Sequence, residues 1–82
     1  MKLRIAALQM ISTRDVTENL NKASKMIAEA AGNGAQVVVL PEFFAKITTS
    51  DDPYRTNHAE DFGCGAIQSY LKDIAVLHGI YI

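Results

Sequence analysis

Glu42 is the residue whose type and position best suit acid–base chemistry. It follows an apolar run, residues 37–40, that is typical of a strand buried on both faces of a parallel sheet. Pro41 has no N–H to give to a sheet, so the strand ends there and Glu42 lies at the carboxyl edge, where open α/β sheets bind ligands. We expect Phe43 and Phe44 to shield the carboxylate from water, which favours a base that works at neutral pH. The alternative is a solvated acid at the mouth of a loop.

The other groups that could do chemistry have simpler interpretations. Cys64 lies between two glycines ahead of an expected helix, where the helix dipole favours a thiolate, but a lone cysteine is more often an inert small residue. We expect Lys46 and His58 to be solvated, and His78 suits the negative end of a helix. No histidine has a partner at metal-ligand spacing, so we expect no metal and no other cofactor.

Apolar patterning predicts two strands joined by a helix. Residues 3–10 are almost continuously apolar, and we expect the first strand there. Asp15, with Glu18 three residues later, forms a capping-box pattern, and apolar residues then recur at steps of four and three, which predicts a helix over residues 15–31. With the second strand at residues 37–40, this is a βαβ unit whose strands are parallel.

The second half of the chain continues the alternation of helix and strand. Residues 45–62 have no periodic pattern, and we expect a functional or mobile loop that covers Glu42. Residues 67–77 carry apolar side chains at helical spacing, and Gly79 is suited to end that helix. Residues 80–82 resemble the start of a third strand. The sequence therefore predicts an α/β fold, a βαβαβ fragment of a larger domain.

The composition bounds the class of protein. The chain has 82 residues, 49% of them hydrophobic, and it is long enough for one domain with a thin core. A net charge of −1 gives no basic surface for nucleic acid or for an anionic membrane, so we expect neither partner. One cysteine excludes an intramolecular disulfide and fits a reducing, cytoplasmic location. We also expect neither a signal peptide nor a membrane-spanning segment.

Taken in order, five stretches of the chain resemble the amino-terminal part of the nitrilase, or carbon–nitrogen hydrolase, superfamily. These stretches are residues 4–10, 19–20, 34–42, 65–68 and 78–82. Together they look most similar to the branch that includes the deaminated-glutathione amidases. The resemblance implies that residues 1–82 are an incomplete, amino-terminal fragment of one carbon–nitrogen hydrolase domain, whose fold is a four-layer αββα sandwich.

The resemblance also implies a mechanism. In the family, a cysteine attacks the amide or nitrile carbon, a glutamate acts as general base, and a lysine stabilises the tetrahedral intermediate. Glu42 matches the glutamate. The family lysine and cysteine would lie beyond these 82 residues, and neither Lys46 nor Cys64 matches their motifs. Phe43 and Phe44 are candidates to line the substrate pocket, and we expect one of them to do so while the other packs in the core.

These observations predict an amidase-type hydrolase of which this chain carries only the general base, with a small-molecule amide as substrate and no activity for the chain alone. Two alternatives stay open. One is a truncated, inactive α/β protein that forms a homo-oligomer through its open sheet, because one layer of helices covers only one face of a parallel sheet. The other is a non-functional remnant of a broken gene.

Overall fold

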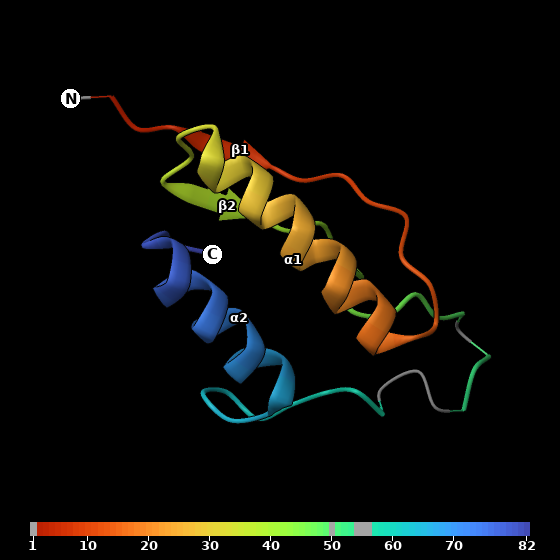
Figure 1. Cartoon of the computed structure of the whole chain (residues 1–82). Coiled ribbons are helices and arrows are strands. Elements are labelled where there is room, and N and C mark those ends of the chain that lie inside the picture. Colours follow the sequence, from red (N-terminus) through yellow and green to blue (C-terminus); the bar gives the residue numbers. More distant parts are fainter. Residues whose placement is uncertain (1, 50, 54–56) are drawn as a thin grey trace.

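The elements follow the predicted α/β alternation along the chain. The computed structural model describes residues 2–49, 51–53 and 57–82. Its elements are β1 (Ile5–Ala7), α1 (Val16–Gly32), β2 (Val37–Val39) and α2 (Ala66–His78), as labelled in Figure 1. In the described part of the chain, neither helix is long and apolar enough to cross a membrane.

The sheet is parallel and β2 lies at its centre. β1 pairs with β2 so that Ile5 is opposite Val37. On the other side of β2, Tyr81 forms a single parallel bridge with Val37. Its N–H donates to the Gln36 carbonyl at 3.0 Å, and its carbonyl accepts from the Val38 N–H at 2.8 Å. The βαβαβ order is therefore confirmed, with the third strand, predicted at residues 80–82, reduced to one bridging residue.

The first strand is shorter than predicted. We expected it over residues 3–10, but β1 covers three residues. One further sheet bond follows it, from the Leu8 N–H to the Val39 carbonyl at 2.9 Å. Beyond that point Pro41 ends β2, so the apolar residues after Leu8 have no neighbouring strand to pair with.

Helix α1 begins where the sequence predicts. The Asp15 side chain accepts a hydrogen bond from the Glu18 N–H at 3.1 Å, which satisfies one of the free donors of the first turn. Glu18 itself pairs with Lys22 one turn later at 3.3 Å. Both groups are well exposed, so this ion pair contributes little to stability.

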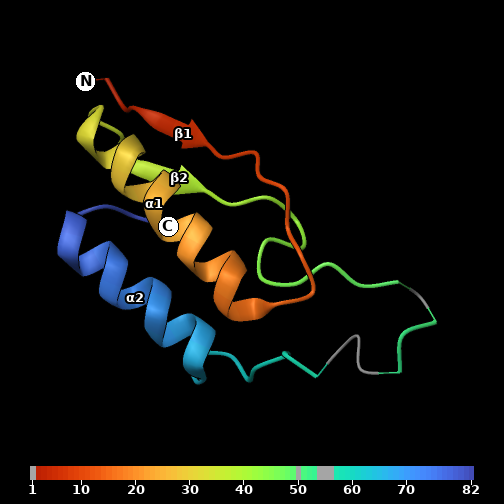
Figure 2. The same cartoon turned by 45° about the vertical axis from the view of Figure 1, so that its right-hand side comes forward.

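Both helices cover the same face of the sheet. They run side by side in Figures 1 and 2, and the buried core joins Ala23 and Ile27 of α1 to Val38 of β2 and Ile74 of α2. Successive strand residues point to opposite faces, so the neighbours of Val38 point away from the helices. On that side, which we call the open sheet face, Ile5, Val39 and Tyr81 are 60%, 51% and 77% exposed.

Helix α2 obtains its amino-terminal cap from an acid in the preceding loop. Its first flanking residue, Gly65, has no side chain with which to cap the helix. Glu60 takes that role, because its carboxylate accepts from the N–H of Ile67 at 2.6 Å and of Gln68 at 3.0 Å. A Cβ at Gly65, which has φ +133°, would collide with the Glu60 carboxyl group. The bond from the Ile67 N–H holds the pKa of Glu60 below its ordinary value.

The thin core makes the chain sensitive to a cavity beneath the sheet. Ile27 is fully buried, so Ile27→Ala is expected to lower the free energy of unfolding by about 2–4 kcal/mol, measured by urea denaturation. Leu77 is 76% exposed on α2, and Leu77→Ala is the control that changes stability little. Equal losses for the two variants would show that the core lies elsewhere.

The cap of α2 predicts a loss of stability in acid. A carboxyl whose pKa is lowered by folding stabilises the folded state above its ordinary value of 4.5, and this contribution disappears as the pH falls through the folded pKa. Glu60→Gln should therefore be less stable than the parent at neutral pH and lose less stability below pH 4.5, as followed by circular dichroism during denaturation. Glu29→Gln, at an exposed position of α1, should keep the parent's acid sensitivity. The same pH profile for Glu60→Gln and the parent would contradict this role.

Candidate active site at the carboxyl edge of the sheet

Glu42 occupies a tight turn immediately after β2. The Phe44 N–H donates to the Pro41 carbonyl at 3.2 Å, which leaves Glu42 and Phe43 as the two central residues. Phe43 has φ +59° and is the one residue other than glycine with positive φ in the described chain. That left-handed conformation costs a non-glycine residue roughly 1–2 kcal/mol. The turn that presents Glu42 is therefore strained and must be held by its surroundings.

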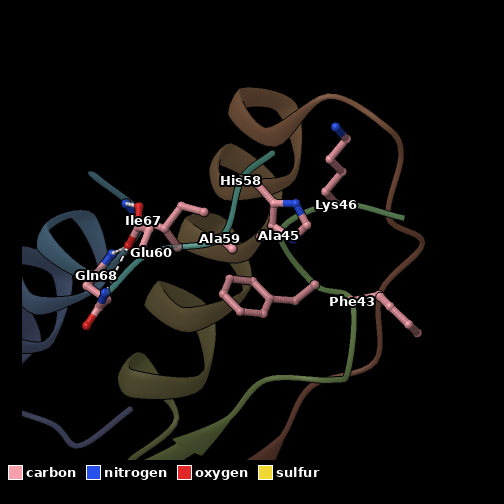
Figure 3. A pocket seen from close by; sticks show the side chains of 9 residues that line it. Phe43, Ala45, Lys46, His58, Ala59, Glu60, Ile67 and Gln68 are labelled. Carbon is pink, nitrogen blue, oxygen red and sulfur yellow. Dashed lines mark hydrogen bonds between the residues drawn. The ribbon is translucent and has the colours of Figure 1, made fainter. Parts of the chain in front are cut away.

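The expectation that Phe43 and Phe44 shield the Glu42 carboxylate from water is wrong for the part of the chain that the structure describes. Glu42 is exposed to solvent. Phe43 is 53% exposed and Figure 3 shows its side chain directed away from the other labelled residues, while Phe44 is half-buried. The reason is local: the turn lies beyond the last backbone bond of the sheet, so its central side chains project past the end of the packed layers.

An open pocket lies beside this turn. It has a volume of about 300 Å³ and forms between the segment that follows Glu42 and the segment that leads into α2. Figure 3 shows His58 and Lys46 at one end of it and Glu60 with Gln68 at the other. The residues that line it are Phe43, Phe44, Ala45, Lys46, His58, Ala59, Glu60, Ile67 and Gln68. Both candidate phenylalanines line this pocket, and Glu42 stands next to it rather than in its wall.

The prediction that His58 is solvated is wrong. It is half-buried, and its Nδ1 is buried without a hydrogen-bond partner among the described residues. Lys46 is also half-buried in the wall of the same pocket. Both lie within the expected loop over residues 45–62. Residues 50 and 54–56 of that loop lie outside the described part, and its described residues form neither helix nor strand.

Cys64 lies apart from the pocket wall. Its side chain is exposed, and its backbone helps to shape the approach to α2: its N–H donates to Asp61 and its carbonyl accepts from Gln68 Nε2 at 2.7 Å. In residues 2–49, 51–53 and 57–82, no three histidine, cysteine or acidic side chains gather as a metal ion would require. The absence of a metal centre stays a prediction.

Asn19 has a role that the sequence reasoning missed. It is fully buried, and its Nδ2 donates to the carbonyls of Thr13 at 2.7 Å and Ala45 at 2.8 Å. Its Oδ1 accepts from the Thr13 N–H at 2.8 Å. A signal was available, because Asn19 lies three residues after Val16 and four before Ala23, on the apolar face of α1. A polar residue there indicates a buried hydrogen-bonding site.

Comparison with known proteins places these features in a family. The sequence profile of the carbon-nitrogen hydrolase family matches residues 4–82. The omega-amidase NIT2-B of Xenopus laevis is 36% identical over 84 aligned positions, and the alignment covers 99% of this chain and 28% of the relative. A nitrilase of Pyrococcus abyssi is 37% identical over 68 aligned positions, and that alignment covers 79% of this chain and 25% of the relative.

A third relative matches a shorter stretch. The deaminated glutathione amidase of Synechocystis sp. is 52% identical over 40 residues, 49% of this chain and 15% of the relative. The chain thus spans 28% or less of the length of the three relatives named here. The match to the family profile nevertheless runs from the first strand through the last residue. The chain belongs to the carbon–nitrogen hydrolase family.

Proposed function

We propose that this chain supplies the general-base segment of an amidase-type carbon–nitrogen hydrolase, with Glu42 as the base. The observation that carries the proposal is the position of Glu42: it directly follows Pro41 at the carboxyl end of a central parallel strand, inside a match to the family that covers residues 4–82. A small-molecule amide is the proposed substrate class. The single cysteine supports a cytoplasmic location.

The neighbouring pocket suits the approach of a small substrate. Its wall combines apolar residues such as Phe44 and Ile67 with the polar side chains of Lys46 and His58, the usual mixture of apolar surface and few polar groups. Glu42 would take the proton of a nucleophilic thiol while the amide carbon is attacked. The exposure of Glu42 supports the view that the nucleophile, the lysine and the cover over this edge come from residues outside this segment, which we propose is the amino-terminal part of one hydrolase domain.

A second candidate function follows from the open sheet face. Ile5, Val39 and Tyr81 present apolar side chains on the side away from the helices. Contiguous apolar surface of this kind marks an interaction site on a soluble domain. If the chain acts alone, we propose that it is an inactive α/β protein that self-associates through this face into a homo-oligomer.

The chain alone is expected to hydrolyse no amide. A general base accelerates a reaction only when the group that it deprotonates is within reach. The catalytic residues of a serine protease form a comparable unit, and there the loss of the nucleophile alone lowers kcat by about 10⁶-fold. Ammonia release from a simple ω-amide and from deaminated glutathione should therefore stay at background for the 82-residue chain. Turnover that disappears in both Glu42→Gln and Cys64→Ala would contradict this and make Cys64 the nucleophile.

The base itself is tested in a chimera. This chain replaces the segment of the Xenopus laevis omega-amidase that aligns with it, and a smaller exchange of residues 37–47 guards against misfolding. Glu42→Gln is expected to lower kcat by at least about 10²-fold, because a carboxamide cannot accept the proton. Glu29→Gln, at an exposed site on α1, is the matched control and should leave kcat unchanged. Equal kcat for Glu42→Gln and its parent would remove Glu42 from the mechanism.

Self-association is tested by sedimentation velocity of the isolated chain. The parent should sediment as a dimer or larger species whose share grows with concentration, because apolar surface is removed from water. Val39→Lys places a charge on the open sheet face and should shift the distribution to monomer. Val76→Lys, at a position on α2 that is 74% exposed, should not. A parent that remains monomeric at all concentrations rules out this face as an interface between copies.

A further inference from the structure

We propose that Asn19 is the positioning residue for Glu42: its buried amide fixes the strained turn that presents the base. The inference rests on the proposed role of Glu42 and goes beyond it, because it assigns to a helix residue the geometry of a turn more than 20 positions away in the sequence. Asn19 does not touch the reacting atoms in this role. It acts through the backbone that carries Glu42.

The first support is that the side-chain amide of Asn19 bonds to two segments at once, the one that contains Thr13 and the one that follows the turn. Both hydrogens of a carboxamide nitrogen can donate. One goes to the Thr13 carbonyl and the other to the Ala45 carbonyl, at 2.7 and 2.8 Å. The amide oxygen accepts from the Thr13 N–H at 2.8 Å. With no exposed surface, Asn19 has no water with which to exchange these bonds, so it imposes one arrangement on both segments.

The second support is that the turn is anchored at both ends. Before Glu42, the Val39 carbonyl accepts from the Leu8 N–H, the last bond of the sheet. After Glu42, three bonds tie residues 44–47 to α1 and to the connection that precedes it: Asn19 of α1 to the Ala45 carbonyl, Ser12 Oγ to the Phe44 carbonyl at 3.1 Å, and the Ile47 N–H to the Thr13 carbonyl at 2.9 Å. Glu42 therefore lies between a sheet anchor and a helix anchor.

The third support is the left-handed backbone of Phe43, at φ +59°. A non-glycine residue keeps such a conformation only where its surroundings over-determine it. The Asn19 anchor provides this constraint, because it holds the chain two residues further along. The observed strain and the buried amide are independent features, and both indicate that the backbone that carries Glu42 is held in one conformation.

A fixed backbone position at Glu42 matters for the proposed chemistry. A general base must stand within hydrogen-bond reach of the proton that it removes. A displacement of about 1 Å at a reacting group can cost about 10²-fold in rate. A glutamate on a free loop would move with that loop, whereas the backbone that carries Glu42 is anchored to a helix.

The structural test uses the isolated chain and Asn19→Asp. This change keeps the acceptor for the Thr13 N–H but replaces the donor by an oxygen that faces two carbonyls. In NMR spectra, the coupling constant and Cα shift of Phe43 should leave the left-handed range. Amide exchange at Phe44 and Ile47 should accelerate about tenfold or more, as expected when a buried bond is lost.

Controls separate positioning from general destabilisation. Asn21→Asp adds the same charge at an exposed site of the same helix and should change neither readout. Exchange at Val38 should stay slow in both variants, which shows that the core is intact. Ser12→Ala removes one bond to the Phe44 carbonyl and is the milder second variant if Asn19→Asp does not fold; it should accelerate exchange at Ile47 in the same direction. Unchanged Phe43 geometry and exchange in the folded variants would overturn the proposal.

The catalytic test uses the first chimera described above, in which the whole of this chain replaces the matched segment, because the smaller exchange does not include Asn19. Asn19→Asp should lower kcat by about 10²-fold with little change in KM, because it misplaces the base without removing a contact to the substrate. Phe43→Gly relieves the strain of the turn, so in that background the Asn19→Asp effect should shrink. Unchanged kcat in Asn19→Asp overturns the positioning role. Full activity in Glu42→Gln overturns the base assignment, and with it the catalytic sense of the anchor, whatever the NMR result.

Discussion

The site depends on one constraint: a carboxamide taken completely out of water must find a partner for every donor and acceptor that it has. Asn19 meets this requirement with three backbone groups from two segments. Leaving a buried polar group unpaired costs about 1–3 kcal/mol, a large share of the stability of a small domain. The segments around Thr13 and Ala45 therefore cannot separate without exposing or orphaning the amide. A helix residue thus determines where a loop lies.

Helix α2 is also held at the site by a residue outside the helix. Its own flanking glycine provides no cap, and Glu60 supplies the missing acceptors from the loop. Glu60 and Gln68 also form part of the pocket wall. The start of the helix and the shape of the pocket therefore depend on the same carboxylate. A change in the loop that moves Glu60 would alter both at once.

The sequence predicts the elements well because their causes are local. The βαβ order, the Asp15 cap and the end of β2 at Pro41 follow from periodicity, capping chemistry and the missing N–H of proline. The position of Glu42 at the sheet edge follows from the same reasoning. What could not be predicted has non-local causes: the Glu60 cap joins residues across a loop, and the exposure of Glu42 depends on what packs over the sheet edge. The left-handed Phe43 contradicts local preference, and only tertiary bonds explain it.

The run of three valines in β2 has a consequence for register. A shift of one residue along a strand turns every side chain to the opposite face. In β2 such a shift would put one valine in place of another, so the apolar core could not detect the error. Hydrogen bonds before and after β2 must therefore determine its register. At one end, Gln36 Oε1 accepts from the Arg4 N–H at 3.0 Å while the Gln36 N–H donates to the Arg4 carbonyl. At the other end, the Asn19 anchor holds the chain after the turn. Together these two contacts fix the register of β2 and therefore the point at which the chain leaves the sheet and enters the turn of Glu42.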